Sequence, residues 1–346
     1  CGDRSRYIAY DDIYLTQTDM YTYSYSTSFD GEGAITSAID YVASEDQMQL
    51  YLLEGHGEAG LPSDFSDQIE RENIQTQTFS LLNVDAIPED ADCIMIYGPS
   101  SDISQEEKDM LAEYVEGGGK LLVMAGPTED GILENLYSLL GDYGVEPVDG
   151  IVVEGDREHY AFQTPVALMP DMASSDITDS LVEENYYPIL PVAQGLNVGE
   201  NPTDATVTTL LTTSDASFSK LAGFDMQSYE KEDGDIDGPF ALAVNVECTS
   251  GGQIVWFSSS DFLENAYNAF SSGANVNLAM NALSSALGES EAMAIRSKSL
   301  NYNYLTISDS TASLLKVTMI GVFPLLFLGI GIIVVVRRRR MQNEPG

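Results

Sequence analysis

The sequence predicts an α/β fold in which a mostly parallel sheet is flanked by helices. Short apolar runs recur along the chain, at Met48–Leu53, Cys93–Tyr97 and Lys120–Ala125. Segments with apolar residues at helical spacing separate these runs, and glycine, proline and serine follow them. Continuous apolar strands are typical of a parallel sheet that is covered on both faces, and helices are the usual connections between parallel strands.

The order of the elements follows from apolar spacing, turn residues and helix caps. A short helical stripe at Ile35, Ala38, Ile39 and Val42 precedes the first strand. The elements expected after it are a strand at 48–53, a helix that begins at Pro62-Ser63-Asp64, strands at 76–82 and 93–97, a helix capped by Ser104 and Glu107, a strand at 120–125 and a helix at 132–140.

The second half of the chain is less regular. Prolines interrupt residues 146–235, which we expect to be an irregular insertion. Strand-like runs return at 206–211, 238–246 and 252–257, and we expect them to add antiparallel strands to the sheet. A one-sided apolar stripe then predicts a helix from about residue 275.

An uncharged run of twenty residues, Val317–Val336, stands directly before four arginines. As a helix it would span about 30 Å, the thickness of a bilayer's hydrocarbon core. The sequence therefore predicts one C-terminal transmembrane helix at residues 316–337, in the cell membrane. Because the arginines follow the run and only Lys316 precedes it, the basic tail, residues 338–346, is expected in the cytoplasm.

The rest of the chain is then expected on the extracytoplasmic side. It comprises an α/β domain at 46–290 and a juxtamembrane stalk at 291–315. Residues 1–45 are expected to form a polar lead-in after a missing N-terminal membrane segment, because export of such a domain requires an upstream signal or helix. Cys1 is expected to be either the point where the chain was cut after that helix or the lipidated end of a mature lipoprotein.

The charge balance excludes one class of partner. Of the 55 acidic residues 54 precede Lys316, as do only ten of the 15 basic residues. Phosphate affinity comes from lysine and arginine, so this surface is not expected to bind nucleic acid. The three cysteines, Cys1, Cys93 and Cys248, form no disulfide framework. Cys93 opens an apolar run and is expected to be buried, and one bond between Cys93 and Cys248 stays open.

Motifs for common catalytic chemistry are absent from the sequence. It contains no G-x-x-x-x-G-K-[ST] loop and no G-x-S-x-G elbow. It contains only two histidines, which excludes a histidine-rich metal site and makes a Ser–His–Asp triad a poor interpretation. Residues 233–238 resemble the start of a calcium loop, but Val244 stands where the bidentate glutamate belongs, so we interpret them as a turn. No catalytic residue, metal or cofactor is predicted.

Candidate ligand-binding residues stand where the predicted parallel strands end. Ligands of open α/β sheets bind beyond the carboxyl ends of the strands. Those ends carry His56, Glu58, Ser100, Ser260 and Asp261. His56 with Glu58 would suit the holding of a polar group or the transfer of a proton. The alternative interpretation is that these residues only form turns and helix caps.

The predicted membrane helix has its own candidate contacts. Pro324 permits a kink, and Gly321, Gly329 and Gly331 would let a partner helix approach closely.

Several segments together resemble the GldG-type auxiliary subunits of ABC export systems. They are Gly31–Ile39, Tyr51–Glu58, Gly238–Val244, Phe257–Leu263 and the final apolar segment with its arginines. The resemblance covers nearly the whole chain. It implies a fold like the class I glutamine amidotransferases or the flavodoxins, without the catalytic cysteine. It also implies partners on other chains, namely an ABC permease and an ATPase, in addition to membrane lipid.

The sequence therefore favours a noncatalytic, membrane-anchored auxiliary subunit of an ABC transport system. Its extracytoplasmic domain would bind a substrate or a partner. Two alternatives stay open: an anchored hydrolase or lyase that uses His56 and Glu58, and a surface module that binds a solute, glycan or peptide without a transporter.

Overall fold

The computed structural model describes residues 5–19, 24–43, 47–84, 86–129, 131–200, 202–288, 298–299 and 316–342. The chain divides into two units, Cys1–Leu300 and Asn301–Gly346. The predicted stalk, residues 291–315, lies outside the described residues except for Lys298 and Ser299, as does Cys1.

A sheet of ten strands forms the centre of the first unit. Its main order is β10-β13-β16-β17-β6-β5-β3-β4, and β12 joins β16 to β7. The five strands from β17 to β4 are parallel, and the others pair antiparallel. The bounds are β3 Gln49–Leu53, β4 Gln75–Phe79, β5 Cys93–Tyr97, β6 Lys120–Met124, β7 Val145–Val148, β10 Asp171–Met172, β12 Gly195–Val198, β13 Ala205–Thr212, β16 Ala241–Cys248 and β17 Gln253–Phe257. The expected parallel core with antiparallel additions is confirmed.

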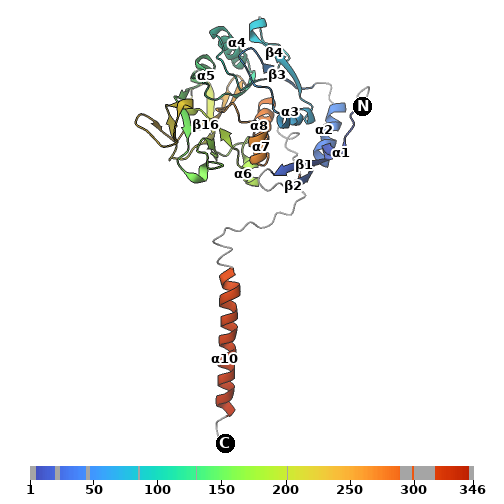
Figure 1. Cartoon of the computed structure of the whole chain (residues 1–346). Coiled ribbons are helices and arrows are strands. Elements are labelled where there is room, and N and C mark those ends of the chain that lie inside the picture. The colour runs from blue at the N-terminus through green and yellow to red at the C-terminus, as the bar shows by residue number, and fades with distance from the viewer. Residues whose placement is uncertain are drawn as a thin grey trace. The chain divides into compact units, whose positions relative to one another are not determined.

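Helices cover both faces of this sheet (Figure 1). Alternate side chains of each parallel strand enter different cores, so that Leu122 packs with α3 and α8, whereas Val123 packs with α4 and α5. This alternation explains why the strands are apolar throughout, since both faces exclude water. The helices are α3 Ser63–Arg71, α4 Gln105–Glu116, α5 Glu134–Gly141, α7 Asn265–Phe270 and α8 Ala274–Leu287.

The cysteines are reduced in the described part of the chain. Cys93 and Cys248 are both free thiols, so no bond joins them. Cys93 is completely buried, as expected, and burial raises the pKa of its thiol to about 12. A thiol that is protonated at neutral pH is a poor nucleophile.

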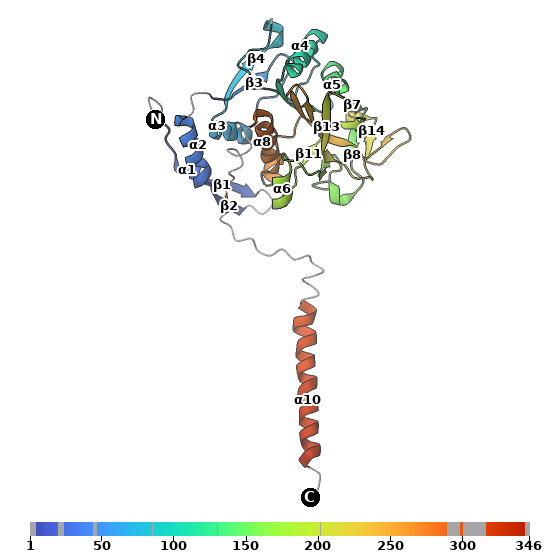
Figure 2. The ribbon, with the colours of Figure 1, turned by 180° about the vertical axis from the view of Figure 1, so that it is seen from behind.

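Residues 146–235 supply β10, β12 and β13 to the central sheet and also form small sheets beside its antiparallel strands (Figure 2). The main-chain contacts of this insertion reach the end of β17, where Gln194 N donates to Ser258 O at 2.8 Å. The elements are β8 Ile151–Val153, η2 Arg157–His159, β9 Ala167–Leu168, α6 Asp179–Glu184, β11 Leu190–Pro191, β14 Phe218–Lys220, η3 Gly223–Asp225 and β15 Ile236–Asp237, and η1 Leu81–Asn83 lies between β4 and β5.

The first 43 residues contain regular elements. These are α1 Tyr10–Ile13, β1 Tyr14–Asp19, β2 Ser24–Phe29 and α2 Gly31–Ala43, and β18 Lys298–Ser299 pairs with β2. The short helix expected around Ile35–Val42 is present as α2, but of its apolar stripe Ala38 is buried whereas Ile35 and Ile39 are exposed. The contact between α2 and the end of α3 is polar instead: Asn73 Nδ2 donates to Ser37 O at 2.8 Å.

The second unit is helical over its described residues. A π-helical turn, η4 Thr318–Val322, precedes α10 Phe323–Gln342. Within the described ranges, no helix combines the length and the apolar character that crossing a membrane requires. This finding corrects the predicted transmembrane helix at 316–337. The physical reason is that α10 begins at Phe323 and includes Arg337–Arg340, so the uncharged run is shared between two helical forms.

Candidate functional site

The turns that follow the parallel strands meet at one edge of the sheet. Ala59 N donates to Tyr97 O at 3.0 Å, and Gly98 N donates to Met124 O at 2.8 Å. These bonds join the turn after β3 to β5, and the turn after β5 to β6. The predicted site residues therefore lie at the carboxyl edge that the sequence indicated.

His56 is buried at this edge between two carboxylates. It is 5% exposed, and its Nδ1 lies 3.2 Å from Glu58 Oε1, while its main-chain N donates to Glu58 Oε2 at 2.8 Å. On the other side, Nε2 lies 3.1 Å from Glu107 Oε2. Each ring nitrogen thus has a carboxylate oxygen within hydrogen-bond distance. The imidazole therefore has no free nitrogen for a ligand.

Glu107 contacts His56 and also caps its own helix, and only the capping role was recognisable in the sequence. Its Oε2 accepts from Ser104 N at 2.8 Å, and Ser104 Oγ accepts from Glu107 N at 3.3 Å, which confirms the predicted capping box. Burial alone would raise the pKa of this carboxyl. The Ser104 hydrogen bonds and the neighbouring His56 outweigh burial, so the pKa of Glu107 lies below its ordinary value. Glu107 is thus ionised at neutral pH.

Ser100 is tied to the backbone of His56. The main-chain O of His56 accepts from Ser100 N at 3.0 Å and from Ser101 N at 2.9 Å. Between His56 and Glu58, Gly57 has φ +72°, and a Cβ there would collide with Ser100 Oγ. Only glycine fits this left-handed position so close to the next turn.

Ser260 and Asp261 lie in the turn after β17 and form a separate group. Ser260 Oγ accepts from Gly126 N at 2.8 Å. Asp261 is exposed, and partial desolvation raises the pKa of its carboxyl. Burial, followed by the charges of Asp261 and Glu264, raises the pKa of the Tyr97 hydroxyl. In the described part of the chain, no hydrogen bond or ion pair joins this group directly to His56 or Glu58.

Gly126 lets two turns approach each other at this edge. A Cβ on Gly126 would stand 2.9 Å from Ser260 N and 3.2 Å from Val192 O. These are backbone atoms, which a side chain cannot push aside cheaply. The close approach that glycine allows here thus serves chain packing.

We expect Gly126→Ala to lower the free energy of unfolding by about 2 kcal/mol, because overpacking at a backbone contact forces the turns apart. Urea denaturation measures this change. Gly141→Ala is the control, since a Cβ on Gly141 meets nothing within 4 Å and alanine is the better helix former. Equal stabilities of the two variants would contradict the packing role of Gly126.

Two cavities in the described part of the chain are lined by other residues. One, of about 490 Å³, lies where the parallel strands begin and includes Met48 and Gly117–Lys120. The other, of about 300 Å³, lies in the insertion and is lined by Arg157, Tyr160, Phe162 and Gln163. Sequence reasoning missed both, because the segments that line them carry no recognisable motif.

The contacts expected of the second unit lie in its helices. Gly321 belongs to η4, and Pro324, Gly329 and Gly331 belong to α10. A Cβ on any of the three glycines would meet no described atom within 4 Å. Their role in docking a partner helix stays a prediction.

Solved structures that resemble this chain share little of its sequence. It is similar to the mmIFT52 N-terminal domain, with 16% identity and a TM-score of 0.48 over 66% of this chain and 93% of that chain. It is also similar to the cytoplasmic protein STM1381 from Salmonella typhimurium LT2, with 15% identity and a TM-score of 0.36 over 67% and 98%. A third is PurLQS from Thermotoga maritima, with 9% identity and a TM-score of 0.32 over 69% and 99%. Among curated proteins, none matches the sequence.

The family comparison covers most of the α/β unit. The model of the family described as ABC-type uncharacterized transport system matches residues 47–286, which is more than half of the chain. The match spans the strand ends that carry His56 and Ser260, and the whole insertion. The likeness to GldG-type members, and to the amidotransferase or flavodoxin folds, stays a prediction. The chain belongs to the family of ABC-type uncharacterized transport systems.

Proposed function

We propose that this chain is a noncatalytic auxiliary subunit of an ABC transport system, and that its α/β unit binds a substrate or a protein partner. The observation that carries the proposal is that the imidazole of His56 has no ring nitrogen open to a substrate. Both of its ring nitrogens face the carboxylates of Glu58 and Glu107, and the ring is buried. A general acid or base must reach the proton that it transfers, and this imidazole has no open side.

The rival hydrolase has weak support for the same reason. It would need His56 and Glu58 to face a substrate, yet Glu58 accepts from both the ring and the main chain of His56. Ser100, the nearest hydroxyl of the predicted site, lies against the main-chain O of His56. None of these contacts activates a nucleophile.

The location is part of the proposal. Membership of a transport-system family supports an α/β unit that acts beside a membrane transporter, with the permease and the ATPase as separate chains. The acidic surface suits a solvated exterior and disfavours polyanionic partners such as nucleic acid.

Copurification tests this function. The full chain, expressed with an affinity tag in its own cells, is expected to retain a multi-span permease and an ATPase. His56→Gln is expected to retain them as well, because no step of the proposal requires proton transfer. A second variant, with residues 317–336 replaced by leucines, tests whether this segment contacts the permease. Loss of the permease from this variant would show that it does. Turnover of any substrate that His56→Gln abolishes would contradict the noncatalytic role.

A further inference from the structure

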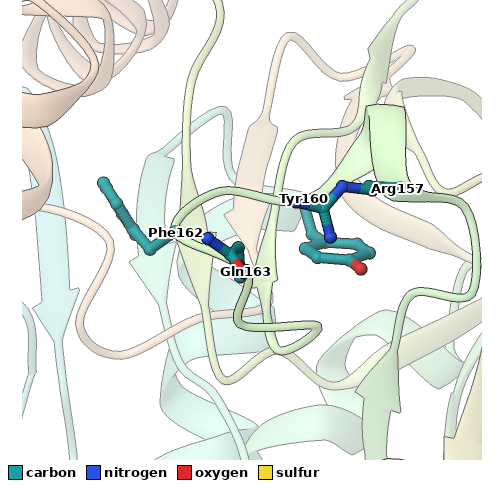
Figure 3. A pocket seen from close by; sticks show the side chains of 4 residues that line it. All are labelled: Arg157, Tyr160, Phe162 and Gln163. Atoms are coloured by element: carbon teal, nitrogen blue, oxygen red, sulfur yellow. The ribbon is translucent and has the colours of Figure 1, made fainter.

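The cavity of about 300 Å³ in the insertion contains an arginine without a carboxylate partner (Figure 3). Arg157 is exposed at the start of η2, and no described residue makes an ion pair or a hydrogen bond with its guanidinium. Its acidic neighbour Asp156 faces His159 instead, at 3.4 Å from Nδ1, and accepts from Glu158 N at 3.0 Å. The charge of Arg157 is therefore available to an anion from outside.

The opposite wall of the cavity is a turn with an unfavourable backbone. Phe162 and Gln163 have φ +56° and +59°, and Thr164 N closes the turn on Ala161 O at 2.9 Å. Turns of this geometry usually carry asparagine and glycine, because other residues adopt left-handed conformations rarely. Such conformations cluster at ligand sites, where the surrounding structure enforces them.

Packing enforces the conformation here. The ring of Phe162 lies 4.5 Å from the ring of Phe270 in α7, and Ala161 N donates to Ala167 O at 2.8 Å. Figure 3 shows that Phe162 points away from Arg157 and Tyr160, which lie together on the other side. With Phe162 anchored, the exposed Gln163 is held at the cavity.

The three remaining groups match one kind of ligand. A guanidinium binds a carboxylate through two parallel hydrogen bonds. A glutamine amide donates and accepts, as a peptide group does, and a tyrosine ring offers an apolar wall. A carboxylate carries a single charge, so the acidic surface repels it less than it repels a phosphate.

We propose that this cavity binds the free α-carboxylate end of a peptide chain. Arg157 holds the carboxylate, Gln163 pairs with the last peptide group, and Tyr160 packs against the terminal side chain. The volume, at the lower end for small-ligand sites, suits one or two residues. This inference deepens the proposed function, on which it rests for its purpose, because it names the class of ligand that the α/β unit presents.

Calorimetry on the purified full chain tests it, with N-acetyl-alanyl-alanine as the probe. The matched control is the same peptide with an amidated C-terminus, which lacks the negative charge and differs in little else. We expect the amidated peptide to bind at least about tenfold more weakly than the acid. Arg157→Gln is expected to cause a similar loss, and Gln163→Gly a smaller one. Both side chains are exposed, so these variants should fold. Lys231→Gln, which removes a paired charge elsewhere in the insertion, is expected to change nothing.

Three results would overturn the proposal. They are equal binding of the acid and the amide, undiminished binding by Arg157→Gln, and displacement of the peptide by inorganic phosphate or acetate at equal concentration, which would indicate a general anion site. The proposed function is tested separately. If Arg157→Gln no longer binds the peptide but still retains the permease and the ATPase, peptide binding and the auxiliary role are independent of each other. A chain that binds the peptide without retaining either subunit would contradict the auxiliary role alone.

Discussion

Replacing Lys220 with methionine is expected to lower the free energy of unfolding by about 3–5 kcal/mol, because it leaves a buried carboxylate without its cation. The side chain of Lys220 is 1% exposed and that of Asp235 is 5% exposed, and Nζ lies 3.5 Å from Asp235 Oδ2. Nζ also donates to Glu230 O at 2.6 Å. Methionine has a similar volume, so the loss reflects the charge and the hydrogen bond of Nζ rather than packing. Urea denaturation at pH 7 measures it.

Acid should affect this variant differently from the native protein. Burial would raise the pKa of Asp235, but hydrogen bonds from the main-chain N of Glu232 and Leu221, together with the charge of Lys220, lower it. A carboxyl with a lowered folded pKa adds stability above its unfolded pKa, about 3.9, and this stability is lost as the pH falls through the folded value. Without Lys220 the pKa rises, so the native protein's advantage over the variant shrinks on acidification.

The control is the pair Lys220→Met with Asp235→Asn, which removes both charges. It should recover most of the stability, because a neutral pair leaves no buried charge unpaired. If the double variant is no more stable than Lys220→Met, the ion pair is not the cause. Glu232, which lies 3.4 Å from Nζ with most of its side chain in water, is expected to contribute little.

Replacing His56 with alanine is expected to cost about 3 kcal/mol, the second largest effect, because two buried carboxylates lose their shared partner. The side chains of Glu58 and Glu107 are 8% and 4% exposed. The variant also loses the packing of the ring, and this part of the cost does not depend on pH. Urea denaturation at pH 7 and at pH 5 separates the two parts.

The sign follows from Glu107. Its pKa is lowered in the native protein, so it adds stability above its unfolded pKa, about 4.3, and this stability is lost as the pH falls through the folded value. Without His56 its charge and hydrogen bond are lost while the Ser104 hydrogen bonds remain, so the pKa of Glu107 rises from its native value. More of this carboxyl is then protonated as the pH falls, and the deficit of the variant should be smaller at pH 5 than at pH 7. An equal deficit at the two pH values would show that charge is not involved. Glu107→Gln in the His56→Ala background should also restore part of the loss.

The parallel core was predictable because both of its faces are covered. Every residue of β5 is buried, so Cys93–Tyr97 had to be an unbroken apolar run. The cap of α4 was also readable, since Ser104 and Glu107 are three residues apart and act locally. The carboxyl edge followed from topology alone, because parallel strands end on the same side.

Contacts between distant segments were not predictable. His56 and Glu107 are 51 residues apart, and nothing in either segment indicates the other. The second role of Glu107 therefore stayed hidden behind its cap. The cavity around Arg157 depends on a turn whose residues, Phe162 and Gln163, do not resemble a turn sequence. At α2 the apolar spacing was correct, but no element of the described structure covers Ile35 and Ile39.

The main-chain oxygen of His56 has a consequence for how the domain opens. It accepts from the amides of Ser100 and Ser101, in the segment that leads into α4, whereas His56 itself leads into α3. The two helices belong to opposite layers, so a single carbonyl connects the layers on either side of the sheet. Local opening of either helix layer must break the hydrogen bonds to this carbonyl. The carboxyl edge therefore opens as one cooperative unit.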